Sequence, residues 1–368
     1  MGVMDATVGD DECNCIVSRR SLCYNNDIVS PFSNESCRKV FVLCREGGHK
    51  TVAGHGRAGA VMSGGRLLTP KEQVEHLKAK GVTFNLCSEQ EAERFLTEHS
   101  YLSKVSAYRK NYQKQPPGSP TAGRYIRLDF AYLIELSTID MHLRYEIIAL
   151  CLDVEHAIKV QLENDMIANP EEDGYRIVKW FTESESRFIE ATERKMLHSY
   201  CREFYFHNAD NLPVWVLFEV LSFGDLIKFY NFYYDVYHQT CRPPLHRSLL
   251  ENVRCLRNAC AHSNCLIADL HHREELNTSL SNYAIRFDWF SPNLRKKYLR
   301  KQFTQDFTAL LIAHKELVHS SGMHAAAARR LRELFGKRML RHRGYFVHND
   351  VIAGAYSYCF ELIHYYFC

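Results

Sequence analysis

Long apolar runs, strand-like alternation and metal-ligand spacings are all missing from this sequence of 368 residues. No apolar run approaches the ~20 residues that a membrane-spanning helix needs, so no membrane partner is expected. Near the start, Asp5, Asp10, Asp11 and Glu12 stand where a secretory signal would carry its apolar stretch. We therefore expect a cytoplasmic protein.

The 14 cysteines do not follow a metal-binding pattern. Cys13 and Cys15 have no second close pair after them, and the spacing of Cys255, Cys260 and Cys265 fits no zinc motif. A cytoplasmic location also disfavours a disulfide framework. Since no Gly-rich loop follows a strand, a phosphotransferase is not indicated either. The sequence predicts neither a metal nor another cofactor.

Two regions are expected along the chain. Residues 1–67 hold five cysteines and many Gly, Ser and Asn residues, with little periodicity. We expect them to form a disordered or poorly structured extension, in which Val40–Leu43 could be a strand. Order is expected to begin at Thr69, where Thr69 and Glu72 flank Pro70 in a capping-box pattern. Ser88 and Glu91 form a second capping box. Residues 68–368 then form one helical domain.

The apolar spacing beyond Thr69 is helical throughout, so the predicted fold class is all-α. Residues 130–166 read as one long bent helix or as two helices. The apolar and aromatic stretch 213–234 is expected in the core. Further helices are expected at about 69–81, 88–96, 101–113, 186–206 and 245–262, with two or three more between 294 and 367.

A candidate catalytic motif lies at the end of the helix expected at 245–262. Arg257, Asn258 and His262 form an R-N-x-x-x-H pattern, with small residues between Asn258 and His262. Cleavage of RNA without a metal needs a base, an acid and a cation beside the phosphate. Histidine can be the acid or the base near neutral pH, and the arginine fork matches phosphate oxygens. Asn258 could orient either group.

The bare R-x4-H spacing is weak by itself, because it occurs twice more. Arg343 and His348 could form a second nuclease motif, although the residues between them read like a turn into an apolar helix. Arg202 and His207 flank Phe204, Tyr205 and Phe206, which favour a core-facing helix end. For any one instance, a solvated arginine and an incidental histidine is the plainer interpretation.

Three segments of the sequence distinguish the Arg257–His262 pattern from the other two R-x4-H occurrences. The first combines a Gln-containing helix, residues 68–81, with the Tyr-rich stretch 102–108. The second pairs Asp140 and Arg144 with the segment 155–159. The third joins a P-x-W…E…SFG stretch, residues 213–224, to L-R-N-x-C-A-H, residues 256–262. In this order and spacing the chain resembles the Abi-like (abortive infection) family, whose members carry a HEPN motif. The resemblance covers roughly residues 68–270.

The resemblance implies metal-independent endonuclease action on RNA, with a homodimer placing two motifs at one composite cleft. It also implies a role in phage defence. RNA and a second copy of the chain are thus the expected partners, with a regulatory small RNA as a further candidate. Many family members have a second histidine after the motif, but Ser263 stands there in this chain, so an auxiliary proton carrier is absent.

Basic clusters late in the chain could contact phosphates, although the net charge is only +3. A solvated helix face is the alternative in each case. A shorter run spans Arg295 to Lys301. The residues assigned to RNA contact in the longer cluster are Arg329, Arg330, Lys337, Arg338 and Arg341.

Two further features have structural alternatives. Glu219, an acid inside an apolar helix, could orient Arg257 or form a purely structural ion pair. The aromatic run 229–237 could stack bases but is more typical of a core or a dimer interface.

Two other functions remain open beside the endonuclease. One is a non-catalytic RNA-binding module, which would not need a histidine at a fixed offset from Arg257. The other is a helical factor that acts in phage defence through a protein partner. That factor would keep its phenotype when His262 is replaced.

Overall fold

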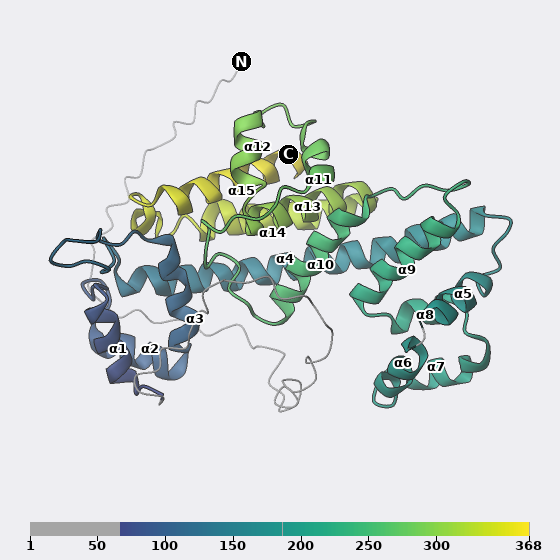
Figure 1. The fold of residues 1–368 in the computed structure, drawn as a ribbon, viewed down its shortest axis with the longest axis horizontal. Coiled ribbons are helices and arrows are strands. Elements are labelled where there is room, and N and C mark those ends of the chain that lie inside the picture. Colours follow the sequence, from purple (N-terminus) through teal and green to yellow (C-terminus); the bar gives the residue numbers. More distant parts are fainter. Residues whose placement is uncertain (1–66, 186, 368) are drawn as a thin grey trace, which may run out of the picture. The chain divides into compact units, whose positions relative to one another are not determined.

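The computed structural model describes residues 67–185 and 187–367, which fold into helices and connecting loops (Figure 1). The all-α class is confirmed, because these residues contain fifteen α-helices, and their only β-type pairings are isolated bridges. The expected N-terminal extension and its strand at Val40–Leu43 lie outside the described residues. Among the described helices, none is both long and apolar enough to cross a membrane.

The first three helices are α1 (Pro70–Ala79), α2 (Glu89–Glu98) and α3 (Leu102–Ala107). Both predicted capping boxes are confirmed, since Thr69 and Ser88 accept from the third helical amide and the glutamate there accepts in return. Gly81 follows α1 with a φ of +87°, and a Cβ there would lie 2.8 Å from the Cβ of Arg124. Only glycine fits this close approach without strain.

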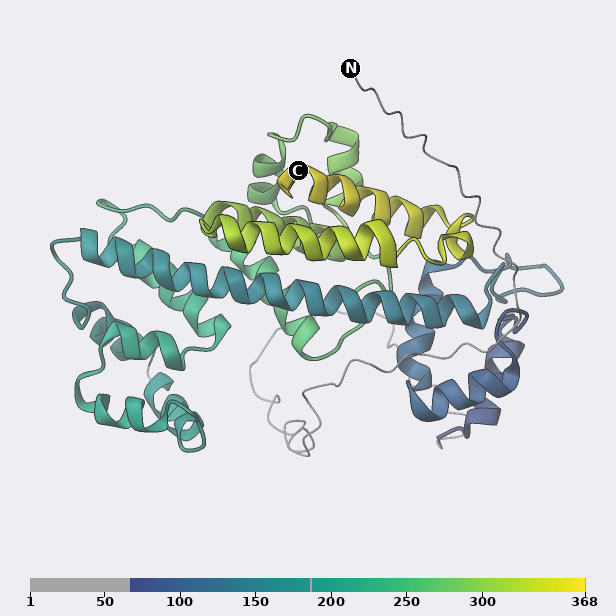
Figure 2. The same cartoon turned by 180° about the vertical axis from the view of Figure 1, so that it is seen from behind.

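One long helix, α4 (Phe130–Ala168, 39 residues), crosses the front of the molecule in the view of Figure 2. It is therefore a single helix, one of the two alternatives that its length left open. Buried residues recur every three or four positions from Phe130 to Met166. The helix packs against α3, α9, α10, α13 and α14, so more than one of its sides is covered.

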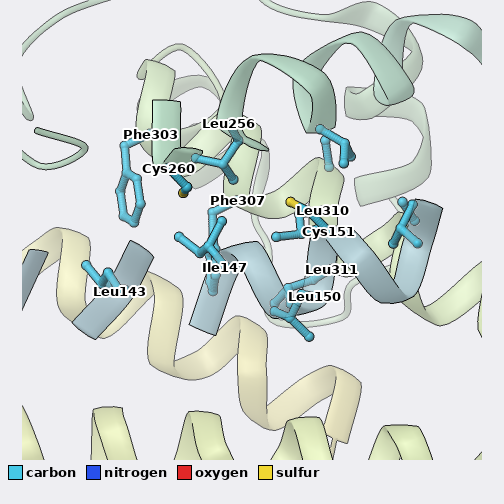
Figure 3. Close-up of a cluster of buried hydrophobic side chains, with 14 of the residues drawn as sticks. Leu143, Ile147, Leu150, Cys151, Leu256, Cys260, Phe303, Phe307, Leu310 and Leu311 are labelled. Atoms are coloured by element: carbon cyan, nitrogen blue, oxygen red, sulfur yellow. The ribbon is translucent and has the colours of Figure 1, made fainter. Parts of the chain in front are cut away.

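The central packing unit consists of α4, α10 (Arg247–Ala261) and α13 (Gln302–Leu317). Figure 3 shows side chains of all three helices meeting in one apolar cluster, with Cys151 of α4 facing the same interior as Leu256 and Phe307. Helix α13 is buried on all sides from Phe303 to His314, as expected of a helix in the middle of a core. The end of α10 therefore packs against the buried core formed with α4 and α13.

Residues 186–206 do not form the single helix predicted from their spacing. They contain α6 (Phe188–Met196) and α7 (Arg202–His207), separated by a turn in which the Ser199 hydroxyl accepts from the Cys201 amide at 3.1 Å. Such local side-chain bonds compete with helical ones. Phe204 and Phe206 are exposed and only Tyr205 is buried, so the expected core-facing end is wrong for two of the three aromatics.

The apolar and aromatic stretch 213–234 lies largely in the core, as predicted, but Trp215 within it is exposed. The stretch forms α8 (Val214–Val220) and α9 (Phe223–Val236), whose Phe229, Tyr230 and Tyr233 are buried. The C-terminal part holds four α-helices where two or three were expected. The remaining helices are α5 (Arg176–Ser184), α11 (Thr278–Ala284), α12 (Pro292–Tyr298), α14 (Ser321–Glu333) and α15 (Asp350–Phe367).

Candidate functional site

Helix α10 ends in a tight turn that fixes the position of His262. His262 is the C-cap, and the next residue, Ser263, has a φ of +54°. The Ser263 amide donates to the Cys260 carbonyl at 3.0 Å and the Asn264 amide to the Ala259 carbonyl at 2.8 Å. These two bonds define a Schellman motif, which usually has glycine where Ser263 stands. A non-glycine residue in this conformation is strained by ~1 kcal/mol.

Arg257, on α10, lies within electrostatic range of Cys151 on α4. Its guanidinium acts electrostatically on the buried Cys151 thiol, and so does the carboxylate of Glu155, one turn further along α4. Burial raises the pKa of Cys151, while Arg257 opposes and Glu155 reinforces the rise. Buried atoms of both charged residues, Nε of Arg257 and Oε2 of Glu155, have no hydrogen-bond partner among the described residues. Buried polar atoms without a hydrogen-bond partner cost free energy, so these two atoms mark Arg257 and Glu155 as candidate functional residues.

Asn258 and His262 complete the predicted motif. The Asn258 carbonyl accepts the His262 amide proton at 3.0 Å, so the two residues are joined through the backbone. His262 is exposed, whereas Arg257 and Asn258 are half-buried. No hydrogen bond between the Arg257 and His262 side chains occurs in the described chain. The geometry gives one accessible imidazole at the helix end and one cation about one and a half turns before it.

The loop after His262 is fastened to α3 and the turn that follows it. Lys104 donates from Nζ to the Ser263 carbonyl at 3.0 Å. Asn111 holds the loop at two points, since its Nδ2 donates to the Ile267 carbonyl and its Oδ1 accepts from the Leu270 amide, both at 2.8 Å. Residues 156 or more positions apart in sequence thus keep the loop in place.

A buried ion pair on α4 makes the second attachment. Asp140 and Arg144 lie one helical turn apart and pair with each other inside the protein. Asp140 accepts from the Ile267 amide at 3.0 Å and from the Tyr108 hydroxyl at 2.9 Å, while Arg144 donates to the Asn264 carbonyl at 3.2 Å. We call this set, with Lys104 and Asn111, the loop clamp. It determines where the chain leaves the end of α10.

The basic cluster assigned to RNA contact is partly neutralised. Arg330 pairs with Glu146 at 2.9 Å, Lys337 with Glu333 at 2.7 Å, and Arg338 with Glu135 at 2.5 Å. Two of these acids are on α4, so Arg330 and Arg338 attach α14 and the π-helical turn after it to the core. Arg329 and Arg341 are exposed. Within the cluster, those two are the side chains left for an external anion.

The remaining predicted residues do not gather around Arg257. Glu219 is exposed on α8 and forms no ion pair with Arg257 in the described chain. Arg343 and His348 are both exposed near the start of α15, and Arg202 and His207 are exposed at the two ends of α7.

Comparison with known families identifies the part of the chain that holds this geometry. Residues 94–268 match the family of Abi-like proteins. No curated protein and no solved structure matches the chain significantly. The matched part, the Abi-like segment, covers just under half of the sequence.

The Abi-like segment contains the end of α10, the loop clamp and the unpaired atoms of Arg257 and Glu155. Asp140 and Arg144, which carried part of the resemblance, belong to the clamp. Glu155 was not predicted as a site residue. Its place near Arg257 becomes visible only when α4 and α10 are paired, and the available signal was its position in the segment 155–159 that carried part of the resemblance.

Proposed function

We propose that this protein is a HEPN-type endoribonuclease of the abortive-infection kind, which cleaves RNA at Arg257 and His262 without a metal. The observation that carries the proposal is the unpaired, partly buried guanidinium of Arg257 on the helix whose C-cap is the exposed His262. Both residues lie in the Abi-like segment. Phosphodiester cleavage requires a cation for the phosphate and an accessible imidazole, and the last turn and a half of α10 carries both.

The chemistry uses the RNA's own 2′-hydroxyl as the nucleophile. A neutral His262 removes its proton, the 2′-oxygen attacks the adjacent phosphorus, and the bond from phosphorus to the 5′-oxygen breaks. A protonated histidine then gives its proton to the leaving 5′-oxygen. Arg257 binds the phosphate oxygens as negative charge accumulates on them, and Asn258 orients the phosphate or the imidazole. The products are a 2′,3′-cyclic phosphate and a 5′-hydroxyl.

Glu155 is assigned a role in the site because of its place near Arg257. The two side chains act on the same point, the Cys151 thiol, from facing helices, and each has a buried atom without a partner. Glu155 therefore acts as a positioning residue, whose negative charge orients the Arg257 guanidinium.

Cleavage of a mixed RNA in excess EDTA tests the proposal. Wild-type protein is expected to produce 2′,3′-cyclic phosphate and 5′-hydroxyl ends. His262→Ala removes the proton carrier and should lower the cleavage rate by ~10²–10⁴-fold. Arg257→Lys keeps the charge but not the planar fork, so most of the activity should be lost.

Arg343→Ala and His348→Ala are the matched controls, because they alter the same spacing at an exposed place away from α10. They should change the rate little. Products with 5′-phosphate ends, or loss of activity in EDTA, would refute the mechanism. Full activity of His262→Ala would refute the site, whereas no cleavage by the wild-type protein would favour a protein that only binds RNA or another protein.

A further inference from the structure

A cavity of about 610 Å³ lies outside the Abi-like segment and is lined almost wholly by cations. It is formed by α12, the residues that follow it, and the loop that leads into α11. The lining residues are His271, Arg273, Lys296, Lys297, Arg300 and Lys301. None of them belongs to the candidate cleavage site, so this basic pocket is a separate feature of the protein.

The positive charge of the basic pocket is not balanced by the acids around it. Residues 266–301 contain seven Lys or Arg residues and four Asp or Glu residues. Two of those acids are engaged elsewhere, since Asp269 pairs with Lys110 at 3.6 Å and Glu274 with His272 at 2.8 Å. Within the described chain, the five Lys and Arg side chains of the pocket form no ion pair. Their charge remains available to a ligand.

The cations are also held close together by the backbone. The Glu274 amide donates to the Arg300 carbonyl at 2.7 Å, and Arg273 and Lys301 form an antiparallel bridge. The ammonium groups of Lys297 and Lys301 lie 5.1 and 5.7 Å from the centre of the Tyr298 ring. Tyr298 is itself buried and stacked on Tyr358. Folding thus brings like charges together before any ligand arrives.

The ammonium group of Lys301 is destabilised by the positive charges around it. Burial lowers the pKa of its ammonium group, and the nearby charges of Lys297 and Arg273 lower it further. Like charges confined in this way repel one another, and a multivalent anion between them would relieve the repulsion.

We infer that the basic pocket binds a ligand carrying two or more phosphate groups. A single phosphate would leave most of the five cations unpaired, whereas consecutive phosphates could contact several of them. The volume lies within the ~300–1,000 Å³ usual for small-molecule sites. Such phosphates could come from the backbone of an RNA strand or from a nucleoside polyphosphate. The inference does not depend on RNA cleavage, because the pocket shares no residue with the cleavage site.

Two probes that cannot be cleaved by attack of a 2′-hydroxyl test the inference on the full-length protein. They are inorganic tripolyphosphate and a single-stranded RNA in which every 2′-hydroxyl is methylated. The pocket variant is Lys296→Gln/Arg300→Gln, since both side chains are exposed and their loss should leave the fold intact. The matched control is Lys179→Gln/Arg124→Gln, which removes the same two charge types from exposed positions elsewhere.

Wild type and control are expected to bind tripolyphosphate at one saturable site, and the pocket variant at least ~10-fold more weakly, with a smaller dependence on salt. If the pocket variant also binds the methylated RNA more weakly, and tripolyphosphate displaces that RNA from the wild type, the phosphates belong to an RNA backbone. If the RNA is unaffected by the pocket variant, they belong to a small polyphosphate. Failure of both probes to bind, or equal affinity of pocket variant and control for both probes, would overturn the inference. The cleavage proposal is tested separately, by the end groups formed from unmodified RNA in EDTA.

Discussion

Asp306 is a carboxylic acid enclosed between α10 and α13. Its Oδ1 accepts from the Asn252 side chain at 2.6 Å, and the residue is 5% exposed. Burial raises the pKa of Asp306 to about 7, with a smaller contribution from Glu274, while the bond from Asn252 opposes the rise. An unfolded aspartate titrates near pH ~3.9. The folded protein therefore holds this proton more tightly than the unfolded chain does.

The sign of the pH effect follows from this difference. The stabilisation from the bound proton is complete below pH ~3.9 and is lost as the pH rises through about 7. Asp306→Asn keeps an acceptor for Asn252 but never ionises. Its free energy of unfolding should exceed that of wild type by roughly 1–3 kcal/mol at pH 8, with the difference shrinking toward pH 5. Urea unfolding at several pH values measures it.

Asp288→Asn, at an exposed aspartate in the same part of the chain, is the control and should show no such trend. If the free energies of unfolding of Asp306→Asn and wild type differ by the same amount at every pH, the expected cost of burying the Asp306 charge would be contradicted.

Single residues differ in how far the sequence alone could predict their place. Thr69 and Ser88 were predicted correctly as helix caps because each cap depends only on residues within one turn. The motif at Arg257 could be found from its spacing and its neighbours. Glu155 could not be found in this way, because its place near Arg257 depends on the contact between α4 and α10. That contact joins residues about a hundred positions apart in the sequence. The ion pairs of Arg330 and Arg338 with α4 are long-range in the same way.

At the scale of elements, the end of α10 depends on the loop clamp. Asp140 and Arg144 are buried, and each also bonds the loop that follows His262. Removing one member of such a pair leaves an uncompensated buried charge. Arg144→Met should therefore lower the free energy of unfolding by ~3–5 kcal/mol, as measured by urea denaturation.

Asp140→Asn/Arg144→Met removes both charges and should destabilise the protein by less than the two single changes added together. Arg194→Met is the matched control, since Arg194 forms an exposed pair with Glu190 with the same spacing on α6. Such surface pairs contribute ~0–1 kcal/mol. Additive single changes, or a loss no larger than that of the control, would mean that the clamp does not hold the loop.

The boundaries of the helices could be predicted from the sequence only in part. The 39 residues of α4 were identified as helical from their apolar spacing, and the structure decides that they form one helix. The break between α6 and α7 went unnoticed because Ser199 and the residues around it contain no Gly or Pro. Helix-compatible spacing on both sides of a turn does not reveal that the two helices differ in direction.

At the scale of the whole molecule, one chain supplies one motif histidine at the candidate site. Cleavage needs a base and an acid in the same step, and no second titratable side chain is hydrogen-bonded to His262 in the described residues. Ser263, which follows it, cannot carry a proton near neutral pH. Two copies of α10 related by a two-fold axis would supply both histidines and two Arg257 cations at one cleft.

We therefore predict that the active species is a homodimer with a shared site. Sedimentation analysis should give twice the chain mass at concentrations where RNA is cleaved. Wild type mixed with an equal amount of His262→Ala protein, and left to exchange subunits, should retain roughly a quarter of the activity, because only dimers with two intact histidines cleave RNA. Independent sites would retain roughly half, as would a mixture that cannot exchange. An Arg343→Ala mixture provides the control, since it should keep nearly full activity. An active species with the mass of a single chain would exclude the shared site, and cleavage would then need a second proton carrier from the same chain.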